Sequence, residues 1–173
     1  MNAQEKELRM PQPSVLLHFT PLVYGVAGSD TQASAFLSSP EAEQLLVYAD
    51  WMRQMGLGVV LTDSVRRREN GIENLRHIGF VRIVGRESEK RIELYEALDA
   101  EEFSVRQGKL KHLADFDEAL SMFYARDFYF ARSAFTEILR DVPQDALVKW
   151  YLFECERLLN ENADVSFAGE LHL

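Results

Sequence analysis

The hydrophobic period of this chain changes from two to about four near residue 98, and that change constrains the fold more than any other feature. Before it, strand-like runs lie on both sides of one predicted helix; in residues 91–97, Ile92 and Leu94 point to one face and Arg91, Glu93 and Tyr95 to the other. From Asp99 onward the period is close to four, and the pattern indicates no further strand. We therefore expect a mixed α+β domain followed by an all-α domain.

The length of 173 residues allows one medium domain or two small ones, and we expect two. Two prolines within three residues obstruct helix and sheet pairing at the start of the chain, which indicates a loose leader. The expected segments are a disordered leader over 1–13, an α/β domain over 14–98, a linking helix over 99–113 and a helical domain over 114–173.

The stretch from Ser39 to Thr62 predicts a helix that leads into a buried strand. Ser39 is a suitable N-cap, Pro40 suits the first turn, and Gly56 ends the helix. The short apolar run that follows, Val59–Leu61, is typical of a buried strand. One stripe of the helix is apolar and is expected to face a core; it consists of Ala42, Leu45, Leu46, Ala49 and Met52.

Strands are also predicted on both sides of this helix. Residues 76–84 and 91–97 form the clearest β signal and predict an antiparallel hairpin. Near the start, the pattern predicts a buried strand from Ser14, a bend at Pro21 and a second extended piece that ends at Gly28. Residues 29–38 are small and polar around two apolar residues, and we expect a loop with a short strand there.

Charge and cysteine content limit the possible functions. The net charge of −9 argues against nonspecific nucleic-acid binding, although residues 66–91 hold eight Lys and Arg against four acids. Within them, Arg66, Arg67 and Arg68 are candidates for a phosphate or carboxylate clamp, or for a solvated helix face. A single cysteine, Cys155, excludes an internal disulfide and a Cys-based zinc site, and we expect it to serve packing.

The sequence gives no sign of a metal, a cofactor or a membrane. The four histidines stand at no ligand spacing, so we expect neither metal nor cofactor and a structural role for His18. The chain contains no apolar run near the ~20 residues of a membrane span, and its first residues are charged. We expect a cytoplasmic, soluble protein.

The last seventy residues contain three helical patterns and resemble one tetratricopeptide repeat followed by a capping helix. The matching positions are Ala119, Met122, Ala131, Phe135, Ile138 and Pro143, whereas Asp115 and Glu118 depart from the pattern. The resemblance implies packing, dimerisation or a peptide-binding groove. The candidate interaction residues are Phe116, Phe123, Phe128, Phe135, Trp150 and Tyr151.

The first hundred residues resemble the C-terminal half of a class III adenylate or guanylate cyclase domain. Leu17–Gly28 follows the family pattern Ile-His-x-Gly-Pro-x-Val-x-Gly-x-x-Gly, with Thr20 in place of the first glycine. When Ala49 is aligned with the family alanine, Gly56 and the strand after it match the glycine and the strand that follow the helix in the family. Residues 75–98 resemble the family's terminal hairpin. The resemblance implies a ferredoxin-like α/β sandwich fragment, and helical repeats after a cyclase domain are similar to a known bacterial arrangement.

The catalytic residues of the family do not carry over. Val47 stands where the family has its ribose-orienting Asn, Trp51 replaces the Arg that stabilises phosphate charge, and the purine-reading acid falls near Pro40. Neither Val47 nor Trp51 can supply the charge or hydrogen bonds that phosphoryl transfer requires. The resemblance therefore implies a pseudoenzyme in signalling, without catalytic residues.

A half domain would expose strand edges and an apolar helix face, which favour association. We therefore expect a protein-interaction or regulatory module that forms a homodimer or binds an intact cyclase. The alternative is a subunit that contributes to a composite nucleotide cyclase site with a partner chain.

Overall fold

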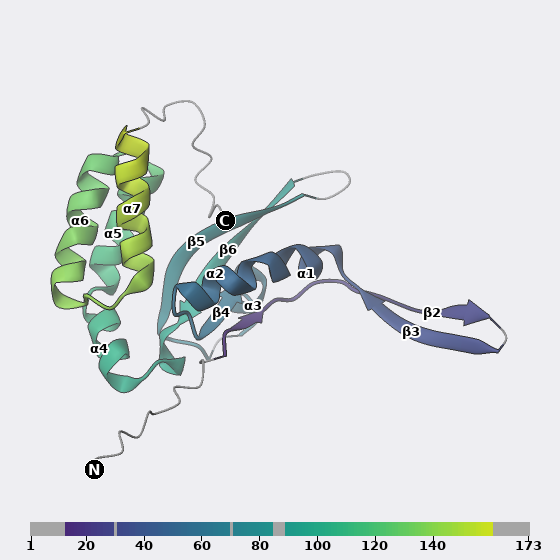
Figure 1. Cartoon of the computed structure of the whole chain (residues 1–173). Helices are drawn as coiled ribbons and strands as arrows, with labels where there is room; N and C mark the ends of the chain where they lie inside the picture. Colours follow the sequence, from purple (N-terminus) through teal and green to yellow (C-terminus); the bar gives the residue numbers. More distant parts are fainter. Residues whose placement is uncertain (1–12, 30, 70, 85–88, 161–173) are drawn as a thin grey trace, which may run out of the picture.

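The structure, a computed structural model, describes residues 13–29, 31–69, 71–84 and 89–160 of the chain. It is a mixed α/β fold with a mixed sheet and helices at the C-terminal end (Figure 1). This confirms the coarse α-and-β class expected from the change of period. The expected leader, apart from Pro13, lies outside the described residues, as do the hairpin turn at 85–88 and the end of the helical segment.

Four strands form the main sheet in the order β1-β4-β6-β5. Strand β1 (Val15–Leu17) runs parallel to β4 (Val59–Thr62), and all other neighbours are antiparallel. Strands β5 (Leu75–Val84) and β6 (Glu89–Ala97) form the predicted hairpin. The buried strand predicted after Gly58 is also confirmed, since β4 lies inside the sheet.

The helix predicted from Ser39 is divided into three pieces. Helix α1 (Pro40–Leu45) is followed by a 3₁₀ turn, η1 (Leu46–Tyr48), and by α2 (Ala49–Gln54). Ser39 caps α1 as predicted, and its hydroxyl accepts the N–H of Ala42. A 3₁₀ turn has fewer residues per turn than an α-helix, so it rotates the apolar stripe.

The rotation corrects one prediction about this stripe. Leu45 and Met52 are buried against the sheet as predicted, but Leu46 is 71% exposed and Ala49 is exposed as well. The end of the helix agrees with the prediction, because Gly56 adopts a φ of 64° that favours glycine.

The C-terminal half is helical, as the period predicted. The linking helix is α4 (Phe103–Lys111), shorter than the 99–113 expected and preceded by a 3₁₀ turn, η2 (Leu98–Ala100). Three further helices pack together: α5 (Leu113–Tyr124), α6 (Phe128–Asp141) and α7 (Ala146–Asn160).

The sheet and these three helices share one hydrophobic core. The rings of Trp51 on α2 and Trp150 on α7 meet edge to face at 5.9 Å. The hydroxyl of Tyr151 donates a hydrogen bond of 2.8 Å to the carbonyl of Ile78 in the edge strand β5. The two expected domains at 14–98 and 114–173 therefore pack on each other through a common interior, and the helices cover one edge of the sheet.

A buried ion cluster also joins the two halves. Arg76 on β5 donates to Glu96 at 2.7 Å and to Asp145 at 2.5 Å, and Lys109 on α4 donates to the other oxygen of Glu96 at 2.5 Å. Burial alone would raise the pKa of Asp145, but the charge and hydrogen bond of Arg76 outweigh it and lower that pKa. Asp145 also accepts the N–H of Val148 and so caps α7.

The largest departure from the sequence predictions lies between β1 and α1. The second extended piece predicted up to Gly28 is present as β2 (Val23–Ser29), but in place of the loop expected over 29–38 the chain forms β3 (Gln32–Ser38), and the two strands pair as a hairpin separate from the main sheet. This hairpin, which we call the arm, extends away from the body of the molecule (Figure 1). The first strand, predicted to be buried, is β1, and its Val15 and Leu17 are exposed.

Candidate functional site

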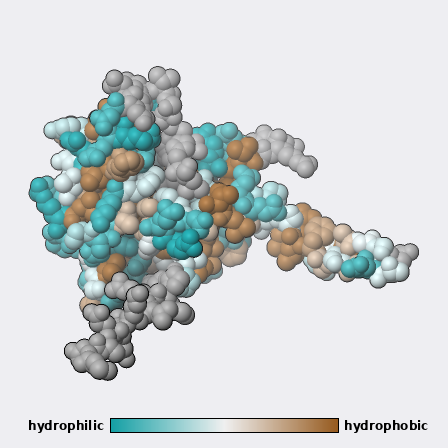
Figure 2. Space-filling model, in the orientation of Figure 1, coloured by the Kyte–Doolittle hydropathy of each residue, from teal (hydrophilic) through white to brown (hydrophobic). Residues whose placement is uncertain are grey.

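The arm exposes large apolar side chains along both of its strands. Tyr24 is 67% exposed, Val26 62% and Leu37 70%, and their neighbours Leu22 and Val23 are similarly open. Figure 2 shows hydrophobic surface over the half of the arm nearest the body. A contiguous patch of this kind on a chain of this size indicates an interaction surface.

The strand register divides the arm into two faces. Tyr24 pairs with Leu37 and Val26 with Ala35, so these side chains lie on the same face. On the other face the ring of Phe36 lies over Gly25, where an added Cβ would come within 2.6 Å of the ring. Phe36 thus fills the space that Gly25 leaves, and the face with Tyr24 and Leu37 is the more open one.

The arm and its flanks are almost free of charge. Between Pro13 and Pro40 the sequence contains one Asp, Glu, Lys or Arg, Asp30, although 27% of the whole chain is charged. Apolar surface without charge carries little desolvation cost when another surface covers it. This composition indicates that the arm is suited to being buried in a contact.

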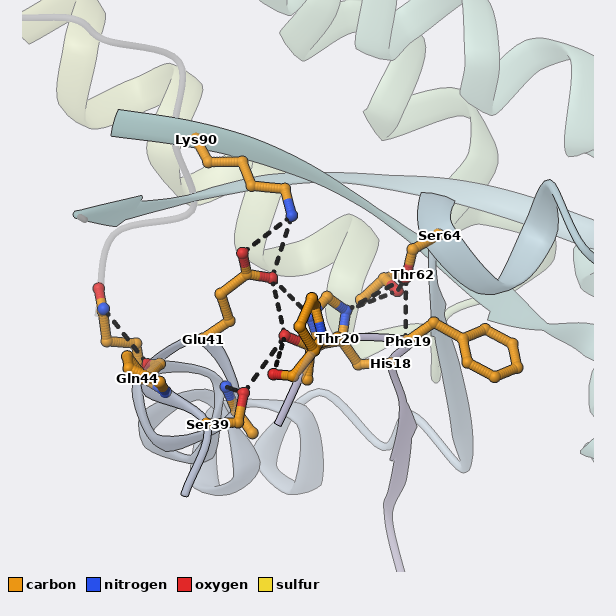
Figure 3. Close-up of polar contacts among 12 residues, drawn as sticks. His18, Phe19, Thr20, Ser39, Glu41, Gln44, Thr62, Ser64 and Lys90 are labelled. Atoms are coloured by element: carbon orange, nitrogen blue, oxygen red, sulfur yellow. Dashed lines mark hydrogen bonds and ion pairs between the residues drawn. The ribbon is translucent and has the colours of Figure 1, made fainter. Parts of the chain in front are cut away.

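A cluster of polar side chains holds the two roots of the arm together (Figure 3). Thr20 precedes β2 and Ser39 follows β3, and their hydroxyl oxygens are 3.2 Å apart. Glu41 at the start of α1 accepts hydrogen bonds from Thr20 at 3.2 Å, from His18 at 3.1 Å and from Lys90 at 3.0 Å. The arm is therefore tied to β1, α1 and β6 at its base.

The charge on Glu41 is part of this anchor. Burial alone would raise the pKa of its carboxyl, but hydrogen bonds from Lys90, His18 and Thr20 and the charge of Lys90 lower it below the ordinary value. Glu41 is therefore ionised at neutral pH and serves as the acceptor for all three donors.

The same cluster contains a hydroxyl, an imidazole and a carboxylate in the order found in hydrolase triads. Nδ1 of His18 lies 3.0 Å from the hydroxyl of Thr62 and 3.4 Å from that of Ser64. However, Thr62 is fully buried, and the hydroxyl of Ser64 accepts the backbone N–H of Phe19 at 3.0 Å. Both hydroxyls are committed to internal bonds, so the arrangement supports His18 in the structural role predicted for it.

An apolar cavity of about 310 Å³ opens beside this cluster, between β1 and the α1–α2 segment. Leu16, Leu45 and Met52 form its floor, and Leu46 and Ala49 are exposed at its rim. His18 and Thr20 line the end nearest the arm, while Thr62 and Ser64 are not among the lining residues. The cavity is large enough for one or two apolar side chains of another segment.

The arginine candidates do not converge on one site. The guanidinium of Arg66 stacks over Tyr95 at 4.5 Å, and that of Arg68 stacks over Phe19 at 4.6 Å. Arg67 pairs with Asp63 at 2.6 Å, within the one-turn helix α3 (Asp63–Arg66) and its C-cap. The structure thus gives each arginine a separate partner, as on a solvated face, and does not assemble the clamp.

The aromatic interaction candidates of the helical half are part of the interior, which corrects that prediction. Trp150, half-buried, packs against Trp51 and Tyr151. The others have at most 9% of their surface exposed and so cannot reach a partner; they are Phe116, Phe123, Phe128, Phe135 and Tyr151.

The structure places Val47, Pro40 and Trp51, the three positions singled out by the cyclase resemblance in the sequence, in different surroundings. Val47 is 61% exposed on η1, and Pro40 is the first residue of α1. Trp51 is buried between the sheet and α7, and its Nε1 has no hydrogen-bond partner among the described residues. These three side chains offer no group for phosphoryl chemistry.

Cys155 is fully buried, and burial raises the pKa of its thiol to about 12, which agrees with the predicted packing role. Within the described residues, no three His, Cys, Asp or Glu side chains are grouped so as to hold a metal ion. None of the described helices has the length and hydropathy needed to cross a membrane.

Comparison with family models, with curated proteins and with solved structures gives no match for this chain.

Sequence reasoning missed the arm and the cavity beside it. The sequence predicts β2 as an extended piece, but the small polar residues over 29–38 favour a loop, so neither the pairing of the two strands nor their projection from the body is predicted. The signal that could have identified the arm is the absence of charge over 14–29 and 31–39, combined with Gly28 just before the turn.

Proposed function

We propose that this chain is a catalytically inactive, cyclase-like protein that acts by self-association, and that the arm is the element of contact. The observation that carries the proposal is the exposed, charge-free apolar surface of β2 and β3, held in place by the Glu41 cluster. A monomer in water would leave this surface in contact with solvent, whereas a second copy would cover it.

The absence of catalytic groups supports a role without chemistry. Val47 and Trp51 stand at the positions where a cyclase needs a hydrogen-bond donor and a cation, and the second is buried against Trp150. The segments that carry the cyclase resemblance follow one another along β1, β2, α1–α2, β4 and the β5–β6 hairpin, which supports a ferredoxin-like fragment. The consecutive pairing of α5, α6 and α7 supports the tetratricopeptide-like unit.

Sedimentation velocity of the full chain and of Leu37→Asp tests this function. Leu37 is 70% exposed on the arm, so the charge costs the folded monomer little but must be desolvated in a contact. We expect the wild type to sediment as a dimer at micromolar concentration, and Leu37→Asp to raise the dissociation constant by about a hundredfold, or about 3 kcal/mol.

Phe153→Asp is the matched control, since Phe153 is 62% exposed on α7 in the helical half. It is expected to leave the dimer unchanged. Loss of the dimer in Phe153→Asp but not in Leu37→Asp would place the contact on the helices and contradict the role of the arm.

An activity assay tests the second part of the proposal. With ATP or GTP and Mn²⁺, the purified chain is expected to form no cyclic nucleotide, because no residue at the family positions can stabilise the transferring phosphate. Cyclic nucleotide formation that disappears on mutation of this chain would contradict a non-enzymatic function and favour the composite-site alternative.

A further inference from the structure

We propose that the arm of one copy is received by the apolar cavity between β1 and α1–α2 of a second copy, in a reciprocal contact. This inference rests on the self-association proposed above and adds the surface that receives the arm. Its occupant is the face of the arm that carries Tyr24, Val26 and Leu37.

The cavity matches the arm in chemistry. Its lining contains no Asp, Glu, Lys or Arg; apart from Ser14, His18 and Thr20, it is entirely apolar. From β1 it is Leu16 that faces the cavity, because successive side chains of a strand alternate between the two faces of the sheet. An apolar arm placed there meets apolar side chains and no buried charge.

Charge limits where a second copy of this chain can make contact. Each copy carries a net charge of −9, so two copies repel each other over most of their surface. The strands of the arm and the cavity lining contain no charged side chain, and they adjoin each other at the base of the arm. Two copies can approach most closely where these neutral regions face each other.

Geometry excludes the chain's own arm as the occupant. The arm is fixed at both roots by Thr20, Ser39 and Glu41 and extends away from the body (Figures 1 and 3). Seven residues of strand reach about 24 Å. The arm therefore projects beyond its own cavity toward the surface of another molecule.

Reciprocity follows from symmetry. In a dimer with a two-fold axis, if residue i of one copy contacts residue j of the other, then j of the first contacts i of the second. One arm-to-cavity contact therefore implies two, and both contribute to an interface of the roughly 800 Å² per partner that stable complexes bury. The axis lies near the base of the arms, since the cavity adjoins the root of its own arm.

Two neighbouring residues on η1 allow a sharp test. Leu46 lines the cavity and Val47 does not, yet both side chains are well exposed, at 71% and 61%. Leu46→Asp is expected to weaken the dimer at least fiftyfold in sedimentation velocity, and Val47→Asp less than threefold. Equal effects of the two variants would overturn the cavity as the receiving surface.

A mixing experiment tests the reciprocal contact directly. In a mixture of Leu37→Asp and Leu46→Asp, the second protein offers an intact arm and the first an intact cavity, so one of the two contacts is restored. With a mass tag on one variant, we expect heterodimers at concentrations where either variant alone is monomeric.

The outcomes separate this inference from the function on which it rests. If Leu46→Asp dimerises like the wild type while Leu37→Asp does not, the arms contact each other. The cavity proposal then fails, and the self-association proposal stands. If the wild type is monomeric, the self-association proposal fails as well. A monomeric wild type that binds an intact cyclase through the cavity would assign it a different occupant and overturn the inference.

Discussion

The carboxylate of Glu41 shows how one residue can set the position of a whole element. It accepts hydrogen bonds from Thr20, His18 and Lys90, and Thr20 is also within hydrogen-bond distance of Ser39. Ser39 could be predicted as a cap from sequence, since capping is local. The hydrogen bonds of Glu41 could not be predicted from the sequence, because its partners come from segments far apart in the chain.

Replacing Glu41 by Gln removes the charge but keeps the shape of the side chain. The variant is expected to lose about 1 kcal/mol in urea denaturation, and its β2–β3 amides are expected to exchange hydrogen faster. Glu137→Gln is the control, because exposed Glu137 pairs with Arg140 on the same helix α6, in the helical half of the chain. Equal exchange of the arm in both variants would contradict the anchoring role.

The pH dependence of this difference has a definite sign. The pKa of Glu41 is lower in the folded chain than the ordinary value of 4.5, so its contribution is complete above about 4.5 and is lost as the pH falls below it. The stability difference between wild type and Glu41→Gln is expected to be full at pH 7 and to shrink as the pH falls below 4.5 and through the lower folded pKa of Glu41. A difference that persists unchanged at pH 3 would exclude the carboxylate charge as its cause.

Arg76 joins the sheet to the helices, as Glu41 joins the arm to the body. Arg76→Met leaves the buried carboxylates of Glu96 and Asp145 without their main partner, and we expect a loss of about 3–5 kcal/mol in the free energy of unfolding. Arg53→Met removes an exposed pair with Asp50 and is expected to cost less than about 1 kcal/mol. Similar losses in both variants, measured by urea denaturation, would contradict the role of the buried cluster.

At the scale of elements, regular hydrophobic patterns predicted the strands and helices of the body but not the arm. The β5–β6 hairpin and the helices α5, α6 and α7 bury one face each, so their period determines them. The arm buries neither face, so its sequence predicts an extended piece for β2 and only a loop with a short strand where β3 lies. The 3₁₀ turn η1 was missed for a related reason, since propensity does not distinguish it from a continuous helix.

Gly28 gives a test of the arm as an element. Its φ is 156°, and an added Cβ would lie 2.1 Å from the carbonyl oxygen of Gln32. Gly28→Ala is therefore expected to distort the end of the hairpin and to speed hydrogen exchange of β2 and β3, with little change in the unfolding of the body. Gly71→Ala, where an added Cβ meets no atom within 4 Å, is expected to leave exchange in the arm unchanged.

On the scale of the whole molecule, association brings together two strongly acidic bodies through neutral surfaces. Added salt screens the repulsion between the two acidic molecules, and the proposed interface contains no ion pair that salt would weaken. We therefore expect the dimer to tighten as the salt concentration rises from 0.05 M to 0.5 M in sedimentation equilibrium. A dimer that dissociates over this range would indicate a contact made by charged groups and would exclude the arm as its main element.

The mass of the wild-type chain in solution tests self-association most directly. Light scattering at micromolar concentration is expected to give twice the chain mass of 19.9 kDa, with Leu37→Asp at the single mass under the same conditions. A wild type that remains at 19.9 kDa would contradict the central claim that the arm joins two copies of this chain.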